Sequence, residues 1–166
     1  MITNAATGDS QVKALVYVDA FAPDQGQTLA QLLTAYPGSC AVPTNLNVVP
    51  FPGAPSGVGD AYIKQSAFPS CMANDLPAAG ARVLAATQRP IATSALAEPT
   101  GVPAWKTIPS WYLVASNDQA IPPATERFLA KRAGATTVEI ASSHVAMISH
   151  PAVVTDLIRD AAHAVD

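Results

Sequence analysis

The sequence predicts an α/β fold in which helices cover a parallel sheet. Three short runs, at residues 12–18, 110–115 and 136–140, are rich in β-branched and aromatic residues and show little alternation. Runs of this kind are typical of strands buried on both faces, which occur mostly in parallel sheets. Helical patterns follow the second and third runs, and the order of strand, helix, strand, helix favours the same class.

Both of these helices carry recognisable ends. Residues 122–134 begin with two prolines, place an acid early and two bases late, and finish on a glycine. Proline suits the first turn of a helix, glycine suits the residue beyond it, and the charges complement the helix dipole. After Pro151, apolar residues between 153 and 162 repeat on one face, which predicts an amphipathic C-terminal helix.

The segment 25–100 separates the first predicted strand from the second and is too long for an ordinary loop. Its first half is rich in proline and glycine, and helical patterns follow at 75–87 and 90–98. Insertions of this size often form a lid or a functional subdomain. We therefore predict a cap at 25–100 and a core made of residues 1–24 and 101–166.

The composition limits the possible classes of protein. Of the 166 residues, 49% are apolar and 13% are charged, and the net charge is −3. Such a chain is expected to fold as one domain, and the lack of basic runs argues against binding to nucleic acid or to a membrane surface. No run approaches the roughly 18 apolar residues of a membrane helix, and the N-terminus lacks a signal-peptide pattern, so we expect a cytoplasmic protein. The low charge also predicts that a partner covers part of the apolar surface.

The two cysteines give little indication of function. Cys40 and Cys71 lie in loop-like segments, with no CxxC pattern and no histidine at ligand spacing. In a cytoplasmic chain, two such cysteines are expected to be free thiols rather than a disulfide. We predict no metal and no other cofactor.

Two polar loops follow predicted strands. Asp118 comes after the run 110–115, and His144 comes after 136–140. Open α/β sheets bind ligands at the carboxyl ends of their strands, and an acid before a histidine ends a Ser, Asp, His order. A carboxylate on one ring nitrogen of histidine fixes the tautomer in which the other nitrogen acts as a general base. From spacing alone, Asp118 could equally cap a helix, and His144 could be a structural histidine.

Segments along the whole chain resemble α/β-hydrolases, most of all small bacterial esterase-like proteins related to plant methylesterases and hydroxynitrile lyases. These segments lie at 12–24, 75–90, 105–111 and 142–148. In that family the acid has an Asp-x-x-Ile-Pro context and the base a His-x-x-Met context. The resemblance implies that Asp118 and His144 are the acid and base of a Ser-His-Asp triad.

The sequence departs from the family at the nucleophile. The family's serine lies in a Gly-x-Ser-x-Gly elbow, which this sequence lacks; the nearest match, at 8–12, has no second glycine and enters a strand. The resemblance implies the C-terminal portion of the fold, beginning just after the nucleophile and inactive alone. The strand at 12–18 would then lack a neighbour, so we expect self-association through that edge, or poor solubility.

Four further residues near the predicted acid and base or on the last helix bear on the chemistry. Hydroxynitrile lyases of this branch carry a lysine directly after the histidine, so Val145 at that position favours esterase chemistry. Asp19 follows the first strand and is either an alternative acid or a carboxylate that caps a turn. His150 is expected to begin a helix and His163 to lie on a solvated helix face.

Four apolar side chains are candidates for a substrate pocket, although core packing would account for them equally well: Phe21, Phe68, Trp111 and Met147. The resemblance implies that Phe21 and Met147 border the site. The leading hypothesis is a hydrolase portion whose complete form acts on small, uncharged carboxylic esters.

Two other functions stay open. One is a non-catalytic module that binds a small apolar ligand or its own copy. The other is a hydrolase that uses Cys40 or Cys71 as its nucleophile, which would need nearby positive charge to lower the pKa of the thiol.

Overall fold

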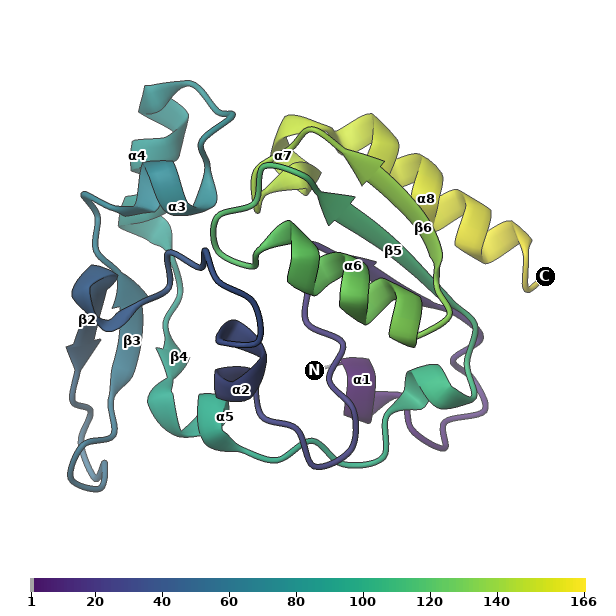
Figure 1. Ribbon diagram of the computed structural model, residues 1–166, viewed down its shortest axis with the longest axis horizontal. Coiled ribbons are helices and arrows are strands. Elements are labelled where there is room, and N and C mark those ends of the chain that lie inside the picture. The colour runs from purple at the N-terminus through teal and green to yellow at the C-terminus, as the bar shows by residue number, and fades with distance from the viewer. Residues whose placement is uncertain (1) are drawn as a thin grey trace.

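The computed structural model describes residues 2–166, and its core is a parallel sheet with the order β1-β5-β6 (Figure 1). The strands are β1 (Leu15–Val18), β5 (Ser110–Ala115) and β6 (Thr136–Ile140). Strands β5 and β6 match the sequence prediction at both ends. Strand β1 begins three residues later than predicted, because Val12 N–H closes a turn onto the carbonyl of Asp9. The predicted parallel α/β sheet is confirmed.

Helices pack on both faces of this sheet (Figure 1). Helix α6 (Pro123–Arg132) packs against β5 with Leu129 and Ala130, whereas α8 (Pro151–His163) packs against β1 and β5 with its own apolar face. Alternate residues of β5 serve the two faces: Tyr112 and Val114 lie in the α6 cluster, and Trp111 and Leu113 in the α8 cluster. Every residue of β5 is buried, as expected for the central strand of a covered sheet.

The segment 25–100 carries a second, antiparallel sheet with the order β2-β3-β4. Its strands are β2 (Leu46–Val49), β3 (Asp60–Ile63) and β4 (Ile91–Ala92). The predicted helical patterns correspond to α4 (Ala78–Thr87) and α5 (Thr93–Ala97). Gly59 allows β2 and β3 to approach closely, because a Cβ there would lie 2.8 Å from the carbonyl oxygen of Val49. Whether this segment works as a cap stays a prediction.

Six shorter elements complete the fold. They are α1 (Ile2–Ala5), α2 (Leu29–Leu33), η1 (Pro43–Asn45), α3 (Phe68–Met72), η2 (Ala104–Lys106) and α7 (Ala146–Ser149). Helix α2 has a full capping box, in which Thr28 and Gln31 each bond the other's backbone N–H. None of the helices between residues 2 and 166 is long and apolar enough to span a bilayer.

Cys40 and Cys71 form a disulfide, so the expectation of free thiols was wrong. Helix α3 brings Cys71 beside the loop that carries Cys40, with a Cα–Cα distance of 5.7 Å. The sequence separation of 31 residues gave no sign of this pairing, because the pairing depends on how the inserted segment folds back. Since both sulfurs are bonded, neither cysteine is available as a nucleophile, which also corrects that hypothesis.

Strand β1 has a free edge. Within residues 2–166 it pairs with β5 alone, in parallel register from Leu15 opposite Ser110 to Val18 opposite Leu113. Beside this strand lies a hollow of about 310 Å³. Its lining is entirely apolar: Ile2, Ala5, Ala6, Val12, Ala14, Leu15 and Val16.

Candidate active site

Asp118 is a buried carboxylate in the loop between β5 and α6. It is 1% exposed, and its Oδ1 accepts hydrogen bonds from the backbone N–H of Ala120 at 2.6 Å and of Ile121 at 3.0 Å. The turn that follows the strand therefore fixes the carboxylate. The N-cap of α6 is Pro122, so Asp118 does not cap that helix. Its Oδ2 accepts neither of these two backbone N–H groups.

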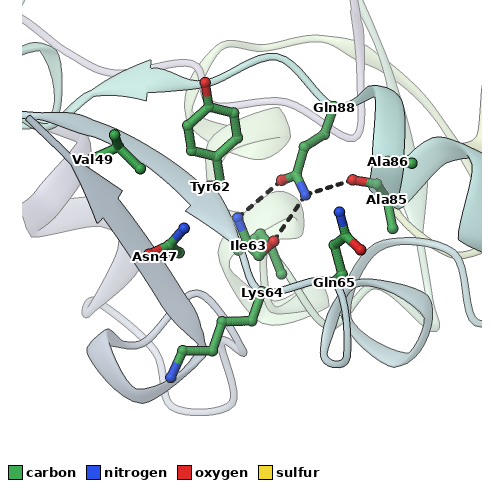
Figure 2. A pocket seen from close by; sticks show the side chains of 9 residues that line it. All are labelled: Asn47, Val49, Tyr62, Ile63, Lys64, Gln65, Ala85, Ala86 and Gln88. Atoms are coloured by element: carbon green, nitrogen blue, oxygen red, sulfur yellow. Dashed lines mark hydrogen bonds between the residues drawn. The ribbon is translucent and has the colours of Figure 1, made fainter. Parts of the chain in front are cut away.

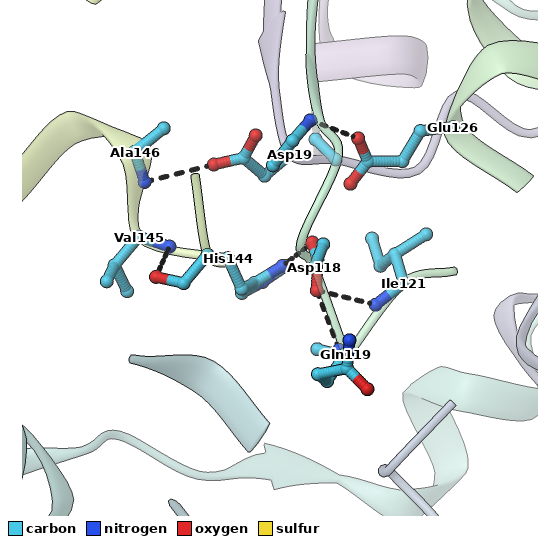
Figure 3. A network of polar contacts seen from close by, with 12 residues as sticks. Asp19, Asp118, Gln119, Ile121, Glu126, His144, Val145 and Ala146 are labelled. Atoms are coloured by element: carbon cyan, nitrogen blue, oxygen red, sulfur yellow. Dashed lines mark hydrogen bonds and ion pairs between the residues drawn. The ribbon is translucent and has the colours of Figure 1, made fainter. Parts of the chain in front are cut away.

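His144, in the loop after β6, lies directly against Asp118. Its Nδ1 is 2.7 Å from Asp118 Oδ2, and the ring is 22% exposed while the carboxylate is fully buried (Figure 3). Burial alone would lower the pKa of His144, but the hydrogen bond and the charge of Asp118 outweigh burial and raise it. With the proton on Nδ1, the neutral imidazole carries its lone pair on Nε2, as a general base requires.

Asp75, from the inserted segment, holds the loop that presents His144. Its Oδ2 accepts from the backbone N–H of Ser143 at 2.9 Å and from the hydroxyl of Ser142 at 3.1 Å, and its Oδ1 accepts from the hydroxyl of Ser143 at 2.5 Å. Burial would raise the pKa of Asp75, but these hydrogen bonds, with one from Ser149, lower it to about 2. No pattern near Asp75 indicates this role, because its partners lie 67 and 68 residues away along the chain.

The Asp118 loop is also held by the inserted segment. The backbone N–H of Cys40 donates to the carbonyl of Gln119 at 2.7 Å, and the hydroxyl of Ser39 donates to the carbonyl of Ala120 at 2.7 Å. Both loops of the acid–base pair are therefore bonded to residues between 25 and 100.

Asp19, the residue directly after β1, has a left-handed backbone conformation with φ of 46°. It is 3% exposed, and its Oδ2 accepts from the backbone N–H of Ala146 at 3.1 Å, at the start of α7. Burial raises the pKa of Asp19 to about 7, against the effect of that hydrogen bond. This contact fits a carboxylate that caps a turn rather than an alternative acid, and the capped turn is the start of α7, two residues after His144 (Figure 3).

A third buried acid is Glu126 of α6, which no pattern in the sequence marks as a site residue. It is 0% exposed, and its Oε2 accepts from the backbone N–H of Ala115 at 2.8 Å. Burial, together with the neighbouring Asp118 side chain, raises the pKa of Glu126. Glu126, Asp118 and His144 bring possible metal-ligand atoms within 4.8 Å of one another. A cation there would compete with His144 for Asp118 Oδ2, because Oδ1 already accepts two N–H groups.

The four predicted pocket residues are spread over the molecule. Phe21 packs half-buried against the α6 cluster, and Met147 is exposed on α7, two residues after Val145. Phe68 is buried in a cluster of the inserted segment against which Val145 packs, and Trp111 is buried under α8. Substrate binding by these residues stays a prediction.

The other predicted polar residues lie as expected on α8. His150 is the residue before its first turn and pairs through Nδ1 with the hydroxyl of Ser149 at 2.9 Å. His163 lies exposed in its last turn.

A hollow of about 300 Å³ lies on the second sheet (Figure 2), and neither Asp118 nor His144 lines it. Its floor is closed by Gln88, whose side chain bonds both the N–H and the carbonyl of Ile63. The lining residues are Asn47, Val49, Tyr62, Ile63, Lys64, Gln65, Ala85, Ala86 and Gln88. Backbone groups of Ile63 and Ala85 therefore satisfy this amide.

Solved structures share this fold. A polyneuridine aldehyde esterase has a TM-score of 0.72 at 18% identity, with 93% of this chain and 64% of that chain covered. A methylesterase from Arabidopsis has a TM-score of 0.72 at 14% identity, with 95% and 62% covered. Tomato methylketone synthase I, solved with 2-tridecanone, has a TM-score of 0.66 at 16% identity, with 92% and 62% covered.

The similar structures show the fold, and a match to a family model identifies the family. The chain spans less than two thirds of the length of the three structures, and no curated protein matches it closely enough to count as a relative. The model of the alpha/beta hydrolase family matches residues 1–157. The chain therefore belongs to the alpha/beta hydrolase family.

Proposed function

We propose that this chain supplies the acid and the base of a serine hydrolase that cleaves small, uncharged carboxylic esters. The observation that carries the proposal is the 2.7 Å contact between His144 Nδ1 and the buried carboxylate of Asp118. A buried carboxylate in this position orients the imidazole and stabilises the imidazolium that forms during acyl transfer.

In the proposed reaction, a serine hydroxyl attacks the ester carbonyl while His144 Nε2 takes the hydroxyl proton. His144 then gives this proton to the departing alcohol, and a water molecule, activated in the same way, releases the acid and restores the serine. Because the sequence contains no Gly-x-Ser-x-Gly, we assign the nucleophile and its oxyanion donors to a segment outside residues 1–166.

The proposed substrate class follows from the surroundings of His144. Val145, Ala146 and Met147 follow it directly, and none of them carries a charge. Two of the similar structures are named as esterases, and a third was solved with a ketone, 2-tridecanone. A small apolar molecule with one polar carbonyl suits such a site.

Labelling with a fluorophosphonate and turnover of p-nitrophenyl acetate test the proposal. The 166-residue chain is expected to take up no label, whereas a version extended upstream through an elbow serine should be labelled and active. In that version, His144→Ala should lower the rate by several orders of magnitude, up to the order of 10⁶. His163→Ala, on the far end of α8, is the matched control and should keep the rate. Covalent labelling of the 166-residue chain at any serine would overturn the proposal.

A second candidate function is association with another copy of this chain, favoured by the free edge of β1. The strand presents unpaired backbone groups beside an apolar hollow of about 310 Å³. Exposed edges of this kind readily pair with a further strand. We propose self-association through residues 12–18, and sedimentation velocity over a range of concentrations tests it. A compact monomer at every concentration would contradict the association.

The cytoplasmic location stays a proposal, and one contact weighs against it. Disulfides such as Cys40–Cys71 persist mainly in oxidising compartments and are rare in the cytosol. Alkylation of the protein in its native host, with and without prior reduction, would decide between the two environments. Alkylation of both cysteines without reduction would support the cytoplasm.

A further inference from the structure

Glu126 is a buried acid that the proposed reaction does not use. It lies in the first turn of α6, and both its side chain and that of Asp118 are shielded from solvent. One oxygen, Oε2, accepts the N–H of Ala115, while the other, Oε1, finds no N–H or O–H donor among the described residues. A carboxyl oxygen of Glu126 also lies within 4.8 Å of one of Asp118 and of a ring nitrogen of His144.

Two carboxyl groups buried this close together strongly disfavour being ionised at the same time, because neither charge is hydrated and each repels the other. Asp118 is the better site for the charge, since it accepts from Ala120, Ile121 and His144. Glu126 accepts from a single backbone N–H. The shared proton therefore belongs on Glu126.

We propose that Glu126 is a neutral acid that donates its proton in a hydrogen bond to Asp118, and so acts as a positioning residue for the Asp118–His144 pair. Asp118 then accepts from both sides, from the Glu126 hydroxyl and from His144 Nδ1–H. The acid proton also accounts for the oxygen of Glu126 that otherwise lacks a donor. This arrangement rests on the proposed function for its use in catalysis, but its protonation state is measurable without any activity.

The surroundings of Glu126 support the neutral form. Burial raises the pKa of its carboxyl well above the ordinary value, and the charges of Asp118 and Asp19 act in the same direction. The titratable groups that face it come from β1, β5, the loop before α6, the loop after β6 and α6 itself: Asp19, Tyr112, Asp118, His144 and Arg127. Arg127 is exposed and is already paired with Glu139.

Carboxyl ¹³C spectra of the 166-residue chain test the protonation state directly, because it contains three glutamates, at positions 98, 126 and 139. We expect the resonance that Glu126→Gln removes to keep the chemical shift of a protonated acid at neutral pH. Glu139→Gln is the matched control, since the Arg127 hydrogen bond lowers the pKa of Glu139. If all three carboxyls are ionised at neutral pH in the wild-type chain, the proposal is wrong, whether or not the variants fold.

Two NMR measurements test the positioning role: the pKa of the His144 ring and the downfield proton signal of its Nδ1–H. Glu126→Gln replaces one neutral donor with another, so the pKa of His144 should be unchanged and the Nδ1–H signal retained. Glu126→Ala removes the donor and should shift or broaden that signal. A lower pKa of His144 in Glu126→Gln would mean that a negative charge had been removed, which overturns the proposal. An unchanged Nδ1–H signal in folded Glu126→Ala would overturn the positioning role.

Linkage gives a third measurement. An acid that keeps its proton in the folded state, but loses it in the unfolded chain, destabilises the protein as pH rises. Between about pH 5 and pH 8, the unfolding equilibrium constant of the wild type relative to Glu126→Gln should rise by up to about tenfold per pH unit. A constant ratio over this range would contradict a neutral Glu126. The outcome is separate from fluorophosphonate labelling, so failure of one proposal is distinguishable from failure of the other.

Discussion

The side chain of Asp75 is bonded at both of its oxygens to Ser143, the residue directly before His144. The hydroxyl of Ser143 donates to Oδ1 at 2.5 Å and its backbone N–H donates to Oδ2 at 2.9 Å. A carboxylate from the inserted segment thus fixes the backbone that presents the base.

Removal of this carboxylate should loosen the His144 loop. Asp75→Ala leaves a backbone N–H without its partner and is expected to lower the free energy of unfolding by about 1–3 kcal/mol. The pKa of Asp75 is about 2 in the folded protein, below its ordinary value, so its contribution is present above about pH 4 and is lost as pH falls toward 2. Urea unfolding of the wild type and the variant should therefore converge at low pH. Asp156→Ala, at an exposed position on α8, is the control. A difference independent of pH would contradict the assignment.

Asp19 predicts an opposite dependence on pH. Its pKa is about 7 in the folded protein, above its ordinary value, so the stability that the neutral form contributes is lost as pH rises from about 4 through 7. Asp19→Asn stays neutral, tolerates the left-handed conformation, and still offers an acceptor to Ala146 N–H. Relative to the wild type, it should gain up to about 4 kcal/mol across this range, measured by urea unfolding at several pH values. Asp19→Ala neither favours the left-handed conformation nor offers an acceptor to Ala146 N–H, so it should be less stable than Asp19→Asn at every pH.

The disulfide should contribute substantially to stability. It closes a loop with a sequence separation of 31 residues, for which the chain-entropy model gives about 3–4 kcal/mol. Cys71→Ser, or reduction of the wild type, should lower the free energy of unfolding by that amount. Cys40→Ser should do the same, and the double variant should cost no more than either single one. A loss that adds across the two substitutions would show that the bond does not form.

The free edge of β1 can be blocked without disturbing its paired edge. The backbone N–H of Leu15 donates to the carbonyl of Pro109, just before β5, and that of Asp19 donates to the carbonyl of Leu113 in β5. Because the N–H groups of a strand alternate between its two edges, the N–H of Val16 points to the free edge. Val16→Pro should abolish concentration-dependent sedimentation while lowering the free energy of unfolding by about 1 kcal/mol. Leu15→Pro, which removes a paired N–H and a buried side chain, should cost about 3 kcal/mol or more. Association that persists in folded Val16→Pro would place the interface elsewhere.

Local pattern was sufficient for the parts of the fold that depend on local chemistry. The buried strands β5 and β6 and the helix ends at Pro123 and Pro151 follow from side-chain preference within a few residues. Spacing placed Asp118 and His144 at the same sheet edge, where carboxyl ends of neighbouring parallel strands meet, but left their roles open, and the expected pairing came from the resemblance to α/β-hydrolases.

The features that the sequence did not predict depend on residues far apart along the chain. Glu126 looks like an ordinary acid in the first turn of a helix, where it would complement the dipole, and nothing nearby indicates that it is buried against Asp118. The second sheet forms from strands of two to four residues separated by proline and glycine, too short to show a period. The pairing of Cys40 with Cys71 becomes visible once this segment has folded.

The Cys40–Cys71 bond has a mechanical consequence for the site. The backbone at Cys40 is bonded to Gln119, next to Asp118, and four residues after Cys71 the chain reaches Asp75, which grips the residue before His144. The disulfide thus joins the two stretches of the inserted segment that are hydrogen-bonded to the Asp118 loop and to the His144 loop. Reduction of this disulfide is therefore expected to loosen the contact between Asp118 Oδ2 and His144 Nδ1.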